Sequence, residues 1–148
     1  MLFRSRAARA PEMTIPATDT PGARAARVHE FIDLILAEWD GDDDRARFLS
    51  GLADVDTRCR DAFGADFLGA SAAQRTAVLS GLDAEVTALR AANASPEKHF
   101  FQRMRSLTVF GYYTSEVGAT QELGYETIPG SFDGCADAKT RRAAPGDF

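Results

Sequence analysis

Residues 100–118 read FFQRMRSLTVFGYYTSEVG, an apolar helical pattern followed by a segment rich in tyrosines and hydroxyl side chains. The inward positions recur at the spacing of one helix face; they are Phe100, Phe101, Met104, Leu107 and Thr108. Ser95, Pro96 and Glu97 stand just before this pattern, as an N-cap, a proline at the first helical position and an acid in the first turn. We therefore expect a helix that begins after Ser95 and runs to about Tyr113.

Three more apolar stripes with the same helical period precede this one in the chain. The first predicts a helix over residues 23–39, and its inward positions are Val28, Phe31, Ile32, Ile35 and Trp39. The second begins after the acidic residues 40–44 and ends at Gly64. The third follows Ser71, which forms a capping box with Gln74.

Each of these helices has a single apolar stripe, so none is stable alone in water. Short connections join them, and this indicates an all-α fold, a small antiparallel four-helix bundle. We expect an extended N-terminal arm over residues 1–22 and a bundle domain over residues 23–123, with a last short helix near 115–123. Residues 124–148 are expected to form an irregular segment rich in glycine, proline and aromatic residues, ending in a tail.

The composition excludes several classes of protein. The chain has 148 residues, 45% hydrophobic and 26% charged, which is typical of one soluble globular domain. A net charge of -5 and a pI near 5.0 argue against nucleic-acid binding, because such domains carry a clustered basic face. No apolar run is long enough to span a membrane, and residues 1–13 lack the hydrophobic stretch of a signal peptide.

No cofactor or metal motif is complete, so we expect this chain to bind neither. P-loop, dinucleotide-binding and nucleophile-elbow patterns are absent from the sequence. Asp40, Asp42 and Asp44 suggest a calcium loop, but Arg45 replaces its glycine and Gly51 replaces its bidentate glutamate. We therefore expect a solvated turn between helices at this run.

The two cysteines and the two histidines are assigned structural rather than chemical roles. Cys59 lies on an apolar helix face, which favours a buried free thiol, with a disulfide to Cys135 as the alternative in an oxidising compartment. His29 and His99 are expected on helix surfaces, because neither has an assignable carboxylate and nucleophile beside it.

The aromatic residues after position 109 have little helical periodicity, and two uses remain open for them. They fill the open end of the bundle or they face a partner, since tyrosine is enriched in protein interfaces. The candidate interface residues are Tyr112, Tyr113, Ser115, Glu116, Tyr125, Pro129 and Phe132. We expect at least one of the two adjacent tyrosines to face a partner.

The run from 100 to 135, FFQRMRSLTVFGYYTSEVGATQELGYETIPGSFDGC, resembles the C-terminal signature of the small subunit, subunit 3, of gluconate 2-dehydrogenase. Paired phenylalanines, then G-Y-x-T-S-E, then Y-x-x-x-P-G-x-[FY]-x-G-C make this pattern fairly specific. The segments TIPATDTPGARAARVHEFIDLIL and FLSGLADVDTRCRDAFGADF are similar to the entry arm and second helix of that family. The resemblance spans roughly residues 14–135.

The resemblance implies a partner rather than a reaction. In such complexes a large flavoprotein of the glucose-methanol-choline type holds FAD and oxidises a sugar or sugar acid, and a cytochrome c takes the electrons. The small subunit stabilises and escorts its partner to the periplasm, so the resemblance implies a periplasmic location; the missing export signal makes the cytoplasm the alternative. Close relatives are also associated with glycoside 3-dehydrogenases, so the resemblance does not specify the sugar substrate.

Two other hypotheses come from different classes of protein. A stand-alone small enzyme would use Tyr112 or Tyr113 with Glu116 as an acid and base pair, because proton transfer needs such groups within hydrogen-bond reach of a substrate. A helical bundle that binds only itself is the second alternative. Both compete with the hypothesis of a non-catalytic dehydrogenase subunit.

Overall fold

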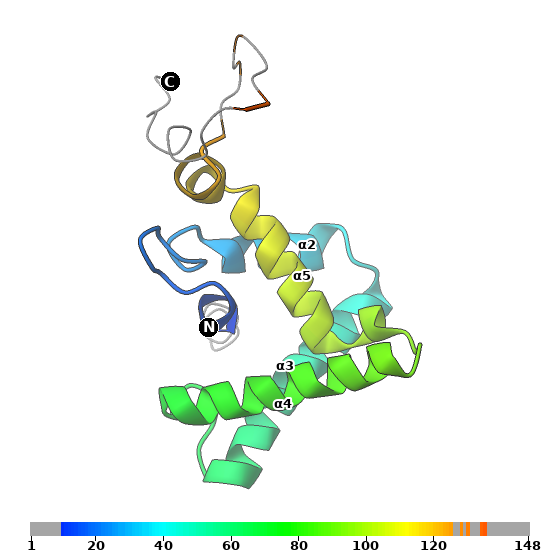
Figure 1. The fold of residues 1–148 in the computed structure, drawn as a ribbon. Helices are drawn as coiled ribbons and strands as arrows, with labels where there is room; N and C mark the ends of the chain where they lie inside the picture. The colour runs from blue at the N-terminus through cyan, green and yellow to red at the C-terminus, as the bar shows by residue number, and fades with distance from the viewer. Residues whose placement is uncertain (1–9, 126–127, 129, 131–133, 136–148) are drawn as a thin grey trace.

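The computed structural model describes residues 10–125, 128, 130 and 134–135, and every regular element among them is helical. The elements are α2 (Val28–Glu38), α3 (Asp42–Phe63), α4 (Ala72–Ala91), the 3₁₀ turn η1 (Pro96–Lys98), α5 (Phe100–Tyr113) and the π-helical turn η2 (Gly118–Glu122). No strand occurs in these residues, so the predicted all-α class is confirmed (Figure 1).

Helix α5 is the central element, since it contacts α2, α3, α4 and η2. Phe31 of α2 meets Phe110 of α5, and Asp40, just after α2, accepts a hydrogen bond from Arg103 at 2.6 Å. These two contacts pair the start of α2 with the end of α5, so the two helices are antiparallel. In Figure 1, α4 and α5 run in clearly different directions, and this pair therefore crosses at an angle.

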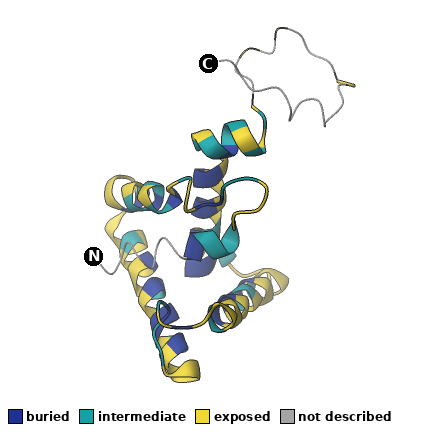
Figure 2. Cartoon of the chain, turned by 90° about the vertical axis from the view of Figure 1, so that its left-hand side faces the viewer, coloured by how far each residue is buried: buried dark blue, intermediate teal, exposed yellow. Residues whose placement is uncertain are grey.

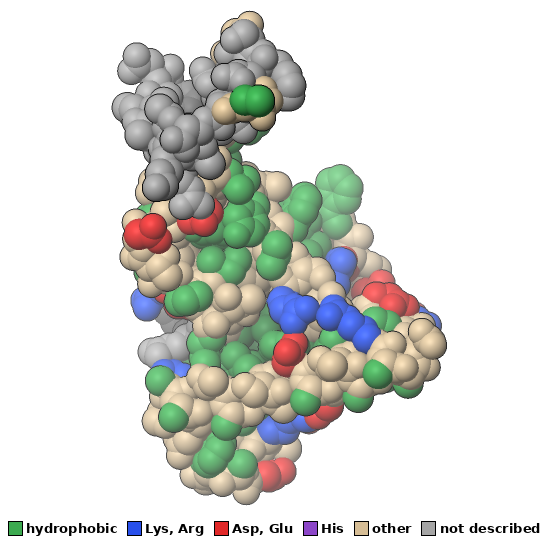
Figure 3. Space-filling model, in the orientation of Figure 1, with side chains coloured by type: hydrophobic (Ala, Val, Ile, Leu, Met, Phe, Trp, Pro, Cys, Tyr) green, Lys and Arg blue, Asp and Glu red, His purple; other side chains and the backbone are tan. Residues whose placement is uncertain are grey.

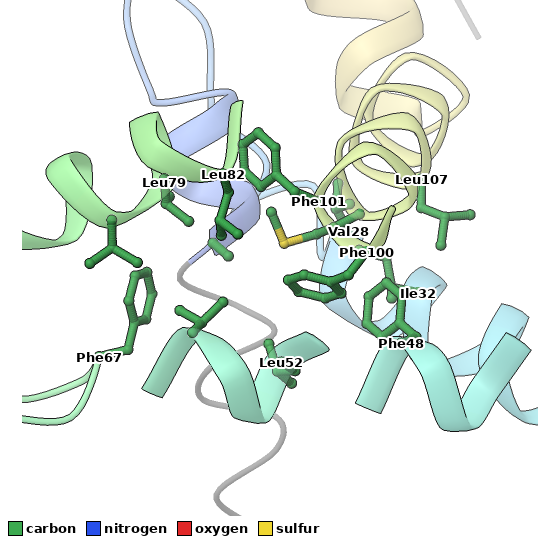
Figure 4. Close-up of a cluster of buried hydrophobic side chains, with 14 of the residues drawn as sticks. Val28, Ile32, Phe48, Leu52, Phe67, Leu79, Leu82, Phe100, Phe101 and Leu107 are labelled. Carbon is green, nitrogen blue, oxygen red and sulfur yellow. The ribbon is translucent and has the colours of Figure 1, made fainter. Parts of the chain in front are cut away.

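The core collects the apolar stripes of all four helices, as Figure 2 shows by the buried faces that turn toward one another. Phe48 and Phe100 pack edge to face with ring centroids 5.1 Å apart, next to Ile32 (Figure 4). Phe67, from the loop after α3, closes the far end of the cluster. Burial of each such side chain stabilises the fold by about 1.5–3 kcal/mol, so every predicted stripe contributes to one shared core.

The predicted first helix is too long at both ends. Residues 23–27 form a turn, and α2 begins at Val28 because Arg27 adopts a left-handed conformation with φ 55°. At the other end, the N–H groups of Trp39 and Asp40 both donate to the carbonyl of Ile35 and end the helix. Trp39, expected inward, is 78% exposed. A helical period predicts a buried face only as far as the helix continues.

The N-terminal arm is not extended throughout. Residues 10–14 are helical, and Ala10 and Pro11 are buried in the core. The chain then doubles back, because the N–H of Ala23 donates to the carbonyl of Ile15 at 2.9 Å. A Cβ on Gly22 would lie 2.6 Å from the backbone nitrogen of Ala17, so glycine permits this close approach. Residues 10–22 are therefore part of the folded unit.

The two predicted N-caps have different outcomes. Ser71 and Gln74 form both hydrogen bonds of the capping box, so this prediction is confirmed. Ser95 makes no side-chain cap, and residues 96–98 form only a 3₁₀ turn. Helix α5 instead begins after His99, whose Nδ1 accepts the N–H of Phe101 at 3.2 Å. The expectation of a surface role for His99 is therefore wrong.

An ion-pair network joins α3, α4 and the start of α5. Arg58 donates to the carboxylate of Glu85 and also to Asp54, and His99 Nε2 lies 3.3 Å from Glu85. The pKa of Glu85 is lowered, chiefly because Arg58 donates to its carboxylate; partial burial acts in the opposite direction, and His99 adds a smaller lowering. The ionised form of Glu85 is thus favoured by folding.

We expect the Glu85→Gln variant to lose less stability than the wild type on acidification. The unfolded state has the higher pKa, about 4.3, so it binds more protons and the stabilisation is lost as the pH falls through the folded-state pKa. Urea unfolding at neutral pH and at about pH 3 measures this difference in unfolding free energy. Glu97→Gln, at an exposed acid of η1, is the matched control; equal acid losses in wild type and Glu85→Gln would contradict the assignment.

Candidate functional site

The candidate residues in the last turn of α5 and after it separate into buried and exposed groups. Tyr112 is only 2% exposed, and its hydroxyl donates to the carbonyl of Pro21 at 2.8 Å. Its ring is enclosed by this chain's own arm and core, so it is unavailable to a partner. Tyr112 is therefore withdrawn from the candidate interface and becomes a cap of the core.

Tyr113, the next residue, has the opposite environment. It is 39% exposed, and its ring packs edge to face on Tyr112 with centroids 5.2 Å apart. This contact restricts the Tyr113 ring without covering it. A pre-ordered, half-exposed tyrosine loses little side-chain entropy on binding, which suits a partner contact.

Ser115 and Glu116 have structural roles at the start of the last helical segment. The hydroxyl of Ser115 accepts the N–H of Gly118 at 3.1 Å and donates to the carbonyl of Tyr112 at 2.6 Å. Glu116 is exposed in the first turn, where the helix dipole favours an acid. The buried Tyr112 hydroxyl is committed to Pro21, so the arrangement does not support an acid and base pair of Tyr112 with Glu116.

Two glycines allow the backbone to approach closely around this segment. A Cβ on Gly111 would lie 2.5 Å from Phe31 of α2. A Cβ on Gly118 would lie 2.0 Å from the carbonyl oxygen of Tyr112, which is backbone and has no room to move. Gly111 thus fixes the α2–α5 crossing, and Gly118 fixes the fold-back of η2 on α5.

An exposed apolar surface lies beside this segment, and we call it the α2/α5 face. It comprises Leu34 of α2 with Val109, Phe110 and Tyr113 of α5. Tyr113 is a helical neighbour of Val109 (i, i+4) and of Phe110 (i, i+3). Phe110, 60% exposed, packs on the half-buried Phe31 with ring centroids 5.8 Å apart. Figure 3 shows hydrophobic side chains gathered over the upper part of this view, around the end of α5. Exposed apolar side chains that gather on one part of a surface are candidates for an interaction site.

Of the later candidates Tyr125, Pro129 and Phe132, the structure describes only Tyr125. Tyr125 is exposed, and its N–H donates to the carbonyl of Ala119 at 2.8 Å. Leu123 and Ile128 are exposed as well. Pro129 and Phe132 lie outside the described residues.

The cysteines are separate in the structure. Cys59 is a buried free thiol, as expected from its stripe, and Cys135 is exposed. Burial, followed by the nearby carboxylates of Asp56 and Asp66, raises the pKa of the Cys59 thiol. A protonated buried thiol is a weak nucleophile, so Cys59 serves packing.

The carboxylates of the acidic run after α2 form ion pairs with arginines. Asp40 pairs with Arg103, Asp44 with Arg47 at 2.6 Å, and Asp42 with Arg45. Across residues 10–125, 128, 130 and 134–135, no three histidine, cysteine, aspartate or glutamate side chains group as metal ligands. The predicted solvated turn is only partly correct, because α3 already begins at Asp42 and the Asp40 side chain is only 8% exposed.

Sequence reasoning missed Phe110 and Trp39 as exposed aromatic residues. Phe110 is out of phase with the inward stripe of α5, and continuing that period beyond Thr108 would have placed it outside with Tyr113. Trp39 gave no such signal, because its exposure depends on where α2 ends. In the part of the chain that the structure describes, no helix is long and apolar enough to cross a membrane.

Comparison with known proteins gives one match. A family model described as gluconate 2-dehydrogenase subunit 3 matches residues 7–130, which are most of the chain and include every helix that the structure describes. No curated protein and no solved structure matches.

Proposed function

This chain belongs to the gluconate 2-dehydrogenase subunit 3 family, and on that premise we propose that it is a non-catalytic companion subunit of an FAD-dependent dehydrogenase complex. The catalytic flavoprotein subunit holds FAD and oxidises a sugar or sugar acid, of the gluconate or glycoside 3-dehydrogenase type. This chain binds no cofactor and stabilises that partner. The observation that carries the proposal is the family match over residues 7–130.

The α2/α5 face supports the proposal, because a companion subunit needs a surface that a partner covers. Phe110 and Tyr113 are large aromatic side chains in half-exposed positions, and such residues supply most of the binding energy in protein interfaces. Gly111 and Phe31 hold the face in place from beneath. We propose that the flavoprotein subunit covers this face and continues onto Leu123 and Tyr125.

Three finer features belong to the proposal and follow the family resemblance. The complex works on the periplasmic side, this chain escorts the flavoprotein there, and a cytochrome c accepts the electrons. Fractionation of cells that express both subunits tests the location independently of the interface.

We expect Phe110→Gln to weaken the complex by about 2 kcal/mol, roughly 30-fold in Kd. Phe110 is exposed in the isolated chain, so its replacement removes partner contacts and leaves the core intact. Co-expression with a tagged flavoprotein subunit, followed by affinity capture and calorimetric titration, measures the loss. Leu49→Gln, at an exposed leucine of α3, is the control and should bind as the wild type does. Equal capture of both variants would place the interface elsewhere.

A further inference from the structure

A hydrogen bond between the N-terminal arm and η2 joins two residues that lie 102 positions apart in the chain. The hydroxyl of Thr20 donates to Glu122 Oε2 at 2.5 Å, and both residues are partly buried. In Figure 1 the golden-brown turn η2 lies just above the blue loop of the arm. We call this pair of side chains the Thr20–Glu122 latch.

The loop that carries Thr20 is itself fixed by backbone contacts. Its two ends meet, because the N–H of Ala23 donates to the carbonyl of Ile15 at 2.9 Å. The carbonyl of Pro21, next to Thr20, accepts the hydroxyl of Tyr112 at 2.8 Å. Because these bonds already order the loop, placing the Thr20 hydroxyl costs little additional conformational entropy.

The beginning of η2 is fixed by α5, whereas its end is not. Gly118 lies against the carbonyl of Tyr112, and its N–H donates to the hydroxyl of Ser115 at 3.1 Å. A five-residue π-helical turn is too short to be stable through its own hydrogen bonds. The end of η2 therefore needs a tertiary contact, and the bond from Thr20 to Glu122 supplies one.

Two exposed apolar side chains follow the latch, Leu123 at 54% and Tyr125 at 60% exposure. Both belong to the surface onto which the catalytic subunit is proposed to continue. The N–H of Leu123 donates to the carbonyl of Gly118 at 3.0 Å. The N–H of Tyr125 donates to the carbonyl of Ala119 at 2.8 Å. Because both backbone positions are tied to η2, the placement of the two side chains depends on where the end of η2 is held.

We propose that Thr20 is a positioning residue for the partner interface. Its hydrogen bond to Glu122 holds the end of η2, so that Leu123 and Tyr125 meet the catalytic subunit in a fixed arrangement. Interface side chains that are ordered in advance bind more tightly, because less conformational entropy is lost on association. The inference rests on the proposed function and deepens it, because it assigns the N-terminal arm a role in binding.

The first test needs no partner and measures amide hydrogen exchange in the full chain. Thr20→Val keeps the shape of the side chain and removes the hydroxyl donor. We expect it to speed exchange of the Leu123 and Tyr125 amides by about fivefold, because the end of η2 opens more often without the latch. The amide of Leu107, in the middle of α5, should exchange as in the wild type. Unchanged exchange at Leu123 and Tyr125, or equal acceleration at Leu107, overturns the proposal.

Two further variants control for the substitution itself. Thr18→Val makes the same change in the same loop, where the Thr18 hydroxyl donates to Asp19 at 3.0 Å rather than to η2. Its Leu123 and Tyr125 amides should exchange as in the wild type. Thr20→Ser keeps the hydroxyl donor and should preserve slow exchange at both amides. An acceleration in Thr18→Val as large as in Thr20→Val would assign the effect to the loop as a whole and contradict the latch.

The second test measures binding of the catalytic subunit by calorimetry. We expect Thr20→Val to weaken binding by about threefold or more, since only the closed form of η2 presents both apolar contacts together. Thr20→Ser and Thr18→Val should each stay within about twofold of the wild type. If the wild type binds and Thr20→Val binds equally well, the latch has no role in binding and the proposed function stands. If the wild type does not bind, the proposed function fails with it.

A double substitution separates positioning from direct contact with the partner. Glu122→Met removes the acceptor of the same hydrogen bond, so it should weaken binding about as much as Thr20→Val does. The two changes together should weaken binding no more than either alone, because each already breaks the bond. Additive losses would show that one of the two side chains touches the catalytic subunit itself, which overturns the positioning role.

Discussion

Replacement of Tyr112 by alanine is expected to lower the free energy of unfolding by about 3–5 kcal/mol, the range for removing a large buried aromatic side chain. The ring is 2% exposed and its hydroxyl ties α5 to the arm at Pro21. Loss of the ring leaves a cavity between these segments, and loss of the hydroxyl leaves the Pro21 carbonyl without its donor. Urea unfolding followed by circular dichroism measures the change.

Two variants sharpen this experiment. Tyr112→Phe keeps the ring and removes only the hydrogen bond to Pro21, so it should cost about 1–3 kcal/mol. Tyr113→Ala, at the exposed neighbour, should cost about 1 kcal/mol or less, mainly through the lost ring contact with Tyr112. A Tyr112→Ala variant that is fully stable but no longer binds the partner would show that Tyr112 is an interface residue after all.

Gly118→Ala is expected to destabilise the fold by about 3 kcal/mol, at the upper end for overpacking. The added methyl group would lie 2.0 Å from the carbonyl oxygen of Tyr112 and 3.0 Å from Cα of Tyr113, both of them backbone atoms. Relief therefore requires η2 to move away from α5, which also disturbs the Ser115 cap. The same unfolding measurement reports the loss.

Gly81→Ala is the matched control for this substitution. Gly81 lies within α4, and a Cβ there meets nothing within 4 Å. Alanine should stabilise the helix by up to about 1 kcal/mol. The same glycine-to-alanine change is therefore expected to raise the free energy of unfolding at Gly81 and to lower it at Gly118. A Gly118→Ala chain as stable as wild type would mean that η2 does not fold back on α5 as described.

The helices were predictable because their signals are local. The inward stripe of α5, the Ser71–Gln74 capping box and the stripe of α3 through Cys59 each depend on residues within a few turns. The boundaries were less predictable, because they depend on tertiary contacts. Arg27 adopts its left-handed conformation at the end of the turn over residues 23–27, which follows the contact of Ala23 with Ile15, and nothing local marks that contact.

The sequence predicted which aromatic residues gather at the end of α5, but not which of them are exposed. Tyr112 and Tyr113 are adjacent and chemically identical, and only the position of the arm decides which of them is covered. The exposure of Phe110 was predictable in principle, because the helical phase of α5 places its side chain on the outer face. The hydrogen bond between Arg103 and Asp40 was not predictable, because the two residues are 63 positions apart in the chain. Pairings of that kind come from packing and leave no mark in local sequence.

The central claim is that this chain is a companion subunit that stabilises an FAD-dependent catalytic partner. The most direct measurement titrates the purified chain into the flavoprotein subunit produced without it, and follows both binding heat and sugar-dependent reduction of an electron-acceptor dye. The account predicts saturable binding. It also predicts that the time for which the flavoprotein stays active increases in proportion to the amount of this chain that is bound. A flavoprotein that is equally stable and active alone, with no binding heat, would contradict it.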